Sequence, residues 1–226
     1  MNFANVKSIT IPQGKVSRII SNGITLWQAD KLPSGCKRVK YLESDGSQYI
    51  DTGIIGKSGI KSFIDFEFVS GSFADFIVFG SASGNGVSSW SNRFYPASAR
   101  DGEWVLGYGD RFYAGVSPSM GQRYKVESEL LVGKQSMTVD GTTIISNKLT
   151  TIVNSNQTMF LFGVNYVGKL NKYGGSRIYS CWIEVGGVLV RDFIPILDMN
   201  NKPCMYDKVT KQFFYNKGTG AFLYNE

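Results

Sequence analysis

The clearest alternation of apolar and polar positions lies in IKSFIDFEF, residues 60–68. Its apolar and small side chains fall on one face, at Ile60, Ser62, Ile64, Phe66 and Phe68, while Lys61, Asp65 and Glu67 fall on the other. Successive side chains of a strand point to opposite faces of its sheet, so a period of two is typical of a half-buried strand. We therefore expect a strand here with one face in the core.

Turn signals separate further segments of strand length. Asn22-Gly23 lies between KVSRIIS and ITLWQ, Asp140-Gly141 lies in SMTVDGTTIIS, and Gly186-Gly187 lies in IYSCWIEVGGVLVRDFIP. Such pairs accept positive φ angles and favour two-residue hairpin loops. LVGK, TMFLFGV and DFIVFG are short apolar runs of buried-strand length, and no segment shows a sustained helical period. The pattern predicts an all-β protein, an antiparallel two-sheet sandwich or jelly roll.

The first thirty residues form a segment of their own. SITIP, KVSRIIS and ITLWQ predict three short strands, too small together to bury both faces of a hairpin. We expect residues 1–30 to attach the protein or join copies of it, residues 31–36 to be a linker, and residues 37–226 to form the sandwich. Packing of the segment against its own sandwich is the alternative. The apolar side chains expected to make the attachment are Val16, Ile19, Ile20, Ile24, Leu26 and Trp27.

The end of the chain raises a choice between a ligand loop and a hairpin. QFFYN and AFLY are strand-like, and Asn216–Gly220 lies between them. A phosphate-binding Gly-x-Gly opens a helix, and no helix start follows this one. We therefore predict a terminal hairpin that pairs into the sandwich.

Composition narrows the chemistry. The chain has 226 residues, a net charge of +6 and no histidine. The basic residues are scattered, which argues against nucleic-acid binding. Without histidine, Ser-His-Asp catalysis and most zinc sites are excluded. Cys36, Cys181 and Cys204 form no CxxC pair, so we expect reduced thiols and no metal or other cofactor.

The sequence shows no targeting signal. No apolar h-region follows Met1, and no apolar run approaches the roughly 18–20 residues that a membrane span needs. We expect neither a signal peptide nor a membrane partner.

Three stretches together resemble a known family. YLESDGSQYIDTGI (41–54), RIYSCWIEVGGVLVRDFIPILD (177–198) and MYDKVTKQFFYNKGTGAF (205–222) look like the LamG-like, concanavalin A-like jelly-roll domains of phage and prophage structural proteins of gut bacteria. The resemblance covers about residues 37–224, and residues 11–29 resemble the short β-segment that often precedes such domains. It implies a two-sheet antiparallel sandwich and frequent glycan binding, without one fixed ligand site.

Sugar sites combine aromatic faces with Asp, Asn and Arg side chains. Residues 88–113 have this composition, although aromatic residues there could equally fill the sandwich. The residues expected to bind a glycan are Trp90, Arg93, Tyr95, Trp104, Tyr108, Asp110 and Arg111.

Catalysis is the weaker expectation. Glycosidases of this shape place carboxylates at alternate positions, as in Glu-x-Asp-x-Glu, and need two of them around the scissile bond. Here Phe63 takes the first position, and Asp65 and Glu67 take the others. Two carboxylates at alternate positions of a strand are also typical of a solvent-exposed sheet edge. We therefore expect that the protein is not an enzyme.

These observations converge on a phage virion protein. We expect an appendage, fibre or decoration protein, made in the host cytoplasm and displayed on the particle surface. Its first segment would bind other virion proteins, a homo-oligomer (a trimer above all) would suit an appendage, and its sandwich would meet host or mucosal glycans. A bacterial glycan-binding or surface-adhesion module is the alternative, and a glycoside hydrolase ranks third.

Overall fold

A computed structural model describes residues 32–84, 92–171 and 174–226, together with the backbone of four short strands within residues 1–31. The chain divides into two compact units, Met1–Gly35 and Cys36–Glu226. Each unit is described by itself.

The first unit contains two small antiparallel pairs. β1 (Thr10–Ile11) pairs with β2 (Gly14–Lys15), and β3 (Arg18–Ser21) pairs with β4 (Ile24–Gln28). The β3–β4 pair brackets Asn22-Gly23, as the hairpin prediction requires. Asn22, Gly23 and Val16 lie outside the described residues, as do the side chains of Ile19, Ile20, Ile24, Leu26 and Trp27. Their predicted role in attachment stays a prediction.

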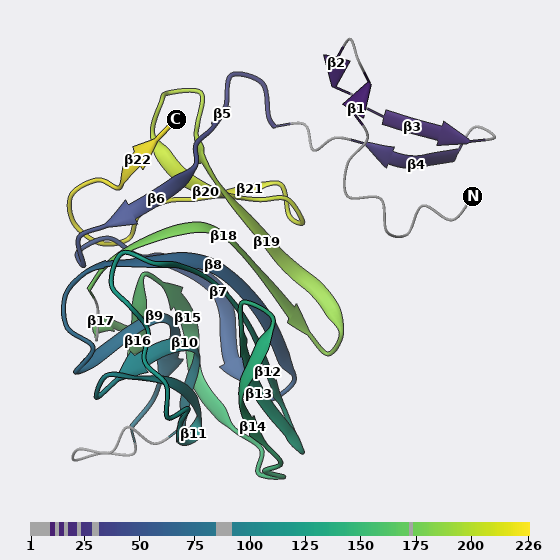
Figure 1. Ribbon diagram of the computed structural model, residues 1–226. Helices are drawn as coiled ribbons and strands as arrows, with labels where there is room; N and C mark the ends of the chain where they lie inside the picture. The colour runs from purple at the N-terminus through teal and green to yellow at the C-terminus, as the bar shows by residue number, and fades with distance from the viewer. Residues whose placement is uncertain are drawn as a thin grey trace. The chain divides into compact units, whose positions relative to one another are not determined.

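The second unit is a sandwich of two sheets (Figure 1). Over the described residues, the first sheet has seven strands: β7 (Ile50–Lys57), β9 (Asp75–Ala82), β10 (Arg93–Arg100), β11 (Glu103–Tyr113), β15 (Asn154–Leu161), β16 (Gly163–Tyr166) and β17 (Lys169–Asn171). The second sheet has eleven: β5 (Lys37–Arg38), β6 (Tyr41–Ser44), β8 (Ile60–Ser70), β12 (Arg123–Leu131), β13 (Lys134–Val139), β14 (Thr142–Asn147), β18 (Gly175–Val185), β19 (Val188–Leu197), β20 (Pro203–Asp207), β21 (Gln212–Phe214) and β22 (Leu223–Asn225).

Strands distant in sequence lie side by side in both sheets. The main path of the seven-stranded sheet is β11-β10-β9-β15-β7, and that of the eleven-stranded sheet is β14-β13-β12-β8-β18-β19-β20-β21. The pairing is antiparallel with one exception, because β16 runs parallel to β9. Phe162 adopts a φ of 70° between β15 and β16, where the chain changes direction. The predicted all-β sandwich is confirmed, and the described part of the chain contains no helix with the length and apolar character needed to cross a membrane.

Local patterns predicted several elements correctly. Asp140-Gly141 and Gly186-Gly187 both have positive φ and join β13 to β14 and β18 to β19. The face of β8 that begins at Ile60 is buried from Ile60 to Phe68, as its alternation predicts, and Ser70 at the end of the strand is exposed. The interpretation of LVGK as a buried strand is wrong. Val132 and Gly133 form the turn between β12 and β13, because Leu131 pairs directly with Lys134.

The predicted terminal hairpin is wrong in its pairing. β21 pairs with β20, and β22 pairs with β6, so the two strands join the sheet at different places. The Asn216–Gly220 segment between them contacts the loop before β7 instead. Asn216 Oδ1 accepts hydrogen bonds from the Tyr49 and Gly218 backbone N–H groups, at 3.1 and 2.8 Å. The Lys217 N–H donates to the Tyr49 carbonyl at 3.0 Å, and the Thr219 N–H donates to the Ser47 carbonyl at 3.1 Å.

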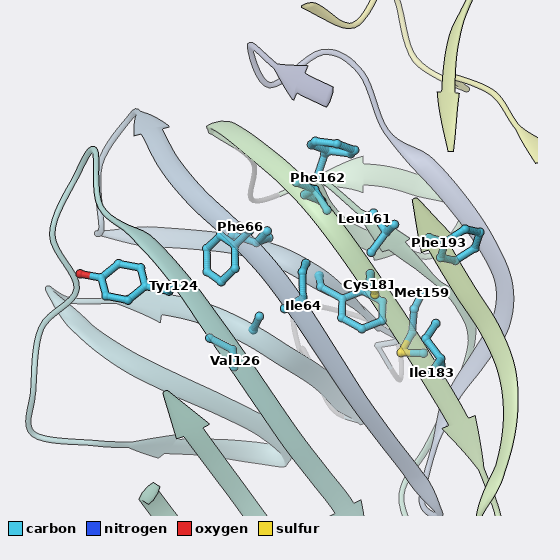
Figure 2. Packing of buried hydrophobic residues seen from close by; sticks show 14 of the residues in the cluster. Ile64, Phe66, Tyr124, Val126, Met159, Leu161, Phe162, Cys181, Ile183 and Phe193 are labelled. Carbon is cyan, nitrogen blue, oxygen red and sulfur yellow. The ribbon is translucent and has the colours of Figure 1, made fainter. Parts of the chain in front are cut away.

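The main core lies between the two sheets. Figure 2 shows Ile64 and Phe66 of β8, Val126 of β12 and Ile183 of β18 gathered with Met159 and Leu161 of the opposite sheet. Burying each such side chain stabilises the fold by about 1.5–3 kcal/mol before the entropy of ordering it is counted. A smaller cluster of Ile77, Ala82, Tyr95 and Val164 forms apart from this core.

Candidate functional site

The outward face of the eleven-stranded sheet carries its polar side chains. β8 lies in the middle of this sheet, between β12 and β18. Its outward positions are Lys61, Phe63, Asp65 and Glu67, since the alternate residues are buried. Two depressions lie on this face, one near Asp65 and one near Lys61.

The half near Asp65 is a closed network. Arg123 donates two hydrogen bonds to the Asp65 carboxylate, at 2.6 and 2.7 Å. Its Cζ atom lies 3.7 Å from the centroid of the Tyr179 ring. Tyr179 donates to Glu67 at 2.9 Å, and Arg177 reaches Glu67 at 3.0 Å and Glu43 at 2.6 Å. Burial, followed by the hydrogen bond to Glu67, raises the pKa of Tyr179 to about 12. Each carboxylate of this network already has a cationic partner, and Asp65, Arg123 and Tyr179 also line a depression of about 460 Å³.

The half near Lys61 is an open groove of about 560 Å³, within the size range of small-ligand sites. Five strands, β14, β13, β12, β8 and β18, contribute to it. We call it the Trp182 groove, and the residues that line it are Lys61, Ser62, Glu127, Ser128, Glu129, Lys134, Ser136, Thr138, Thr143, Ser146, Trp182 and Glu184.

An aromatic pair lies beside the charged part of the groove. The Trp182 and Phe63 rings are stacked almost in parallel, with centroids 6.0 Å apart and planes inclined by 12°. Both side chains are half-buried, so one pair of rings presents flat apolar surface at the sheet face. Trp182 is within the groove lining, and its ring could stack on the apolar face of a sugar.

The polar groups of the groove are held in place around Glu129. Its carboxylate pairs with Lys134 and, at 2.7 Å, with Lys61. The hydrogen bonds from Lys134 and Lys61 lower the pKa of Glu129, so it is ionised at neutral pH. Hydroxyl groups lie nearby, with Thr138 and Thr143 joined at 3.0 Å. The groove therefore offers carboxylate acceptors, ammonium donors and hydroxyls next to an aromatic surface, which is the chemistry that hydrogen-bonds sugar hydroxyls.

The geometry argues against Asp65 and Glu67 as a catalytic pair. Both carboxylates are bound to arginine, and a general acid needs a proton on its carboxyl at working pH. The alternative expectation of a solvated edge is also wrong. Asp65 is buried, and β8 is an interior strand because β12 and β18 flank it.

Three of the residues predicted to bind a glycan are too deeply buried to stack on a sugar ring. Tyr95, Trp104 and Tyr108 are each at most 3% exposed, so none offers a free ring face. Trp104 packs edge-on against Tyr124 in the main core, with centroids 5.0 Å apart. The Tyr108 hydroxyl donates to the Thr151 carbonyl at 2.8 Å. The alternative interpretation, that these aromatics fill the sandwich, is the correct one for Trp104 and Tyr108.

The charged side chains among the residues predicted to bind a glycan lie close to one another. Arg93 lies 3.5 Å from Asp110, and Arg111 lies 3.9 Å from Asp75, on the side of the seven-stranded sheet where Tyr95 is placed. Trp90 lies outside the described residues. Whether Arg93, Asp110 and Arg111 bind a glycan stays a prediction.

The sequence pattern did not predict that Trp182 faces outward, because β18 contains an irregularity. Strict alternation from the buried Ile178 would place Trp182 in the core as well. The register of β18 against β8 shifts between Ile178 and Ser180, and after this bulge Cys181 and Ile183 face inward. Trp182 consequently faces outward beside Phe63.

The cysteines and acidic residues give no metal chemistry in the described regions. No group of three or more potential ligands among His, Cys, Asp and Glu comes together in the part of the chain that the structure describes. All three cysteines are free, and Cys181 and Cys204 are buried. Burial raises the pKa of Cys204 to about 12, so its thiol stays protonated and unreactive at neutral pH.

Comparison with known proteins identifies the fold. No family model matches the sequence, and no curated protein matches it. A candidate carbohydrate binding protein from Bacteroides ovatus ATCC 8483 is similar over 84% of this chain, with 12% identity and a TM-score of 0.54. Domains LG4-5 of the mouse laminin alpha1 chain are similar over 73% of this chain and 45% of their own length, with 13% identity and a TM-score of 0.45. The alginate lyase A1-II′ is similar over 60% of this chain and 66% of its own, with 18% identity and a TM-score of 0.37.

The comparison supports a statement about fold. The chain spans 61% of the length of the Bacteroides ovatus structure, and identities this low show a shared fold alone. Residues 36–226 form a two-sheet sandwich of the jelly-roll kind, and the Bacteroides ovatus structure shares this fold.

Proposed function

We propose that this protein is a non-catalytic glycan-binding sandwich displayed on the surface of a phage particle. The observation that carries the binding proposal is the Trp182 groove on the eleven-stranded sheet. It is an open groove of about 560 Å³ in which the Trp182 ring, stacked on Phe63, lies beside carboxylates, ammonium groups and hydroxyls.

Three outward residues of β8 favour binding over hydrolysis. Phe63 occupies the position where a glycosidase of this shape would place its first carboxylate, and it stacks on Trp182 instead. The next two positions, Asp65 and Glu67, are neutralised by Arg123 and Arg177. Phe63 thus replaces one of the carboxylates, and arginine side chains pair with the other two.

The Trp182→Ala variant tests the binding site. A glycan array would first identify ligands, and calorimetry would then compare variants. We expect Trp182→Ala to weaken binding by about 1 kcal/mol or more, roughly fivefold in Kd, because it removes the stacking surface. Tyr224→Ala is the matched control, since Tyr224 is an exposed aromatic on β22 of the same sheet, outside the groove lining.

Two results would contradict the proposal. Equal glycan binding by the Trp182→Ala variant and the parent would move the site elsewhere. A folded protein that bound nothing on a broad array of neutral and acidic glycans would favour a purely structural role.

The virion location has separate support. Residues 1–35 form a unit distinct from the sandwich, with paired strands of the kind that could join other chains, and residues 11–29 resemble the short segment that precedes such domains in phage proteins. A bacterial glycan-binding module fits the sandwich equally well. Mass spectrometry of purified particles tests the difference, because a virion protein remains with particles through density-gradient purification. Recovery in the bacterial envelope fraction alone would favour the bacterial module.

A further inference from the structure

A further depression lies where β21 meets β7 of the other sheet. β21 is the last strand on the main path of the eleven-stranded sheet. The volume of the depression is about 310 Å³, at the lower end of the range of small-ligand sites. We call it the Phe213 site. β7 contributes Asp51 and Gly53 to its lining, and β21 with the residues after it contributes Gln212, Phe213, Tyr215 and Lys217.

Two hydrogen bonds hold β7 in place beside this site. The Lys217 N–H donates to the Tyr49 carbonyl at 3.0 Å, just before β7 begins. The Arg191 Nε–H donates to the Thr52 carbonyl at 2.9 Å, directly after Asp51. The chain is thus fixed on both sides of Asp51, and a site whose walls are held in this way loses little conformational freedom when a ligand binds.

Two aromatic rings provide the apolar surface of the site. The Phe213 and Tyr215 rings lie with centroids 6.3 Å apart and planes inclined by 35°, and both side chains are half-buried. Tyr206 packs against Phe213 with centroids 5.4 Å apart, and the Tyr215 hydroxyl donates to Asp198 at 2.9 Å. These contacts hold the rings in place. Because both residues line the depression, part of their apolar surface is available to stack on a sugar.

Three polar side chains of the site keep hydrogen-bonding capacity. Asp51 Oδ1 accepts a hydrogen bond from the Gly53 N–H at 2.9 Å, and its carboxylate has no ion pair with any described residue. Gln212 and Lys217 are exposed, and their side chains form no hydrogen bond or ion pair within the regions that the structure describes. Asp51 and Lys217 therefore line one depression without pairing with each other. A carboxylate, an amide and an ammonium group are left for a ligand.

The charges of the site favour a neutral ligand. Asp51 and Lys217 carry opposite charges. So do the two charged groups that contact Tyr215, since Asp198 accepts its hydroxyl and Lys202 Nζ lies 4.8 Å from its ring centroid. A simple ion would be attracted by one charge of each pair and repelled by the other. A sugar hydroxyl both donates and accepts hydrogen bonds, so it can use both groups.

We propose that the Phe213 site is a second carbohydrate-binding site and that it takes one neutral sugar residue of a glycan. The sugar ring stacks on Phe213, one hydroxyl donates to Asp51, and a neighbouring hydroxyl accepts a hydrogen bond from Lys217. The Gln212 amide serves as donor or acceptor at the rim. This site shares no lining residue with the Trp182 groove, so the proposal stands apart from the function proposed for the groove.

Saturation-transfer NMR with simple glycosides tests the site. The probes are the methyl glycosides of glucose, galactose, mannose and N-acetylglucosamine, titrated into the Trp182→Ala protein so that binding in the groove is weakened. We expect at least one glycoside to bind, and Asp51→Asn and Phe213→Leu each to weaken its apparent affinity about fivefold. Asp51→Asn keeps an oxygen for the Gly53 N–H, and Phe213→Leu keeps an apolar side chain against Tyr206.

Gln212→Ala and Gln122→Ala form a matched pair. Both variants remove an exposed amide, but only Gln212 lines the site. We expect Gln212→Ala to weaken glycoside binding about threefold and Gln122→Ala to bind as its parent does. Because both positions are exposed, both variants should unfold at the temperature of their parent, which separates lost binding from lost folding.

The outcomes separate this site from the Trp182 groove. Binding that depends on Asp51 and Phe213 but not on Trp182 supports the Phe213 site, even if the groove binds nothing. Binding in the Trp182→Ala protein that neither Asp51→Asn nor Phe213→Leu weakens would overturn the proposal. Loss of all binding in Trp182→Ala would support the groove and reject the second site. Tighter binding of methyl glucuronide than of methyl glucoside would reject the neutral sugar as the ligand.

Discussion

At the scale of single residues, burial decides what an aromatic side chain can do. Trp104 and Trp182 are equally suited to stack on a sugar by chemistry alone. Trp104 is 3% exposed and packs within the main core, while Trp182 is half-buried at a groove. Composition does not distinguish these two tryptophans. Only the order of the strands and the bulge in β18 determine which of them lies in the core and which faces the groove.

Trp104→Ala should therefore be a stability variant. Removing a buried Trp leaves a cavity beside Tyr124 and Phe66, and we expect a loss of about 3–5 kcal/mol in the free energy of unfolding. Urea unfolding followed by circular dichroism would measure it, with Trp182→Ala as the comparison at a half-buried ring. A Trp104→Ala protein as stable as the parent, yet unable to bind glycan, would return Trp104 to the ligand site.

At the scale of strands, local patterns identified elements but not their neighbours. The alternation of β8 and the turns at Asp140-Gly141 and Gly186-Gly187 are local properties, and each was predicted from the sequence. The partners of β21 and β22 were not. β21 forms a hairpin with β20, which directly precedes it, whereas β22 pairs with β6 near the start of the sandwich. The strand-like runs on either side of residues 216–220 carry no information on that choice.

The same limit applied to the candidate sites. Arg93, Asp110 and Arg111 were grouped because residues 88–113 combine aromatic, Arg and Asp side chains, and the β10–β11 hairpin brings Arg93 and Asp110 together. The Trp182 groove draws residues from five strands. Its outward positions could be read along β8 and β12, but their adjacency depends on sheet order.

The contact between residues 216–220 and residues 47–49 replaces the predicted hairpin and gives a prediction. Asn216→Ala removes the acceptor for two backbone N–H groups and the donor to the Gly220 carbonyl at 3.0 Å. We expect a loss of about 1–3 kcal/mol in the free energy of unfolding. Asn200→Ala, in an exposed turn, should change it by less than about 0.5 kcal/mol.

Gly218→Ala should be more damaging than Asn216→Ala. A Cβ atom at residue 218 would lie 1.8 Å from the Ser47 carbonyl oxygen, so the two segments could not approach as they do. Chemical denaturation of both variants beside the parent measures the difference. If both variants unfold at the same urea concentration as the parent, the contact contributes nothing to stability.

At the scale of the whole molecule, the first unit is expected to join chains. Its β3–β4 hairpin is short and apolar in sequence, and an unpaired hairpin edge invites pairing with another chain. Closed homo-oligomers are the usual outcome, and we favour a trimer. Light scattering should give a multimer for the full chain and a monomer for residues 31–226. A monomeric full chain would instead favour packing of the first unit on its own sandwich.

The pairing of β22 with β6 has a consequence for how this sandwich could be combined with other proteins. The Lys40 N–H donates to the Asn225 carbonyl at 2.7 Å, so the chain enters and leaves the sandwich at neighbouring points. A domain whose ends lie together can interrupt a surface loop of a host protein without forcing that loop apart. The jelly roll is thus suited to transfer between unrelated proteins as an insertion, and anything fused after residue 226 would emerge beside Lys40.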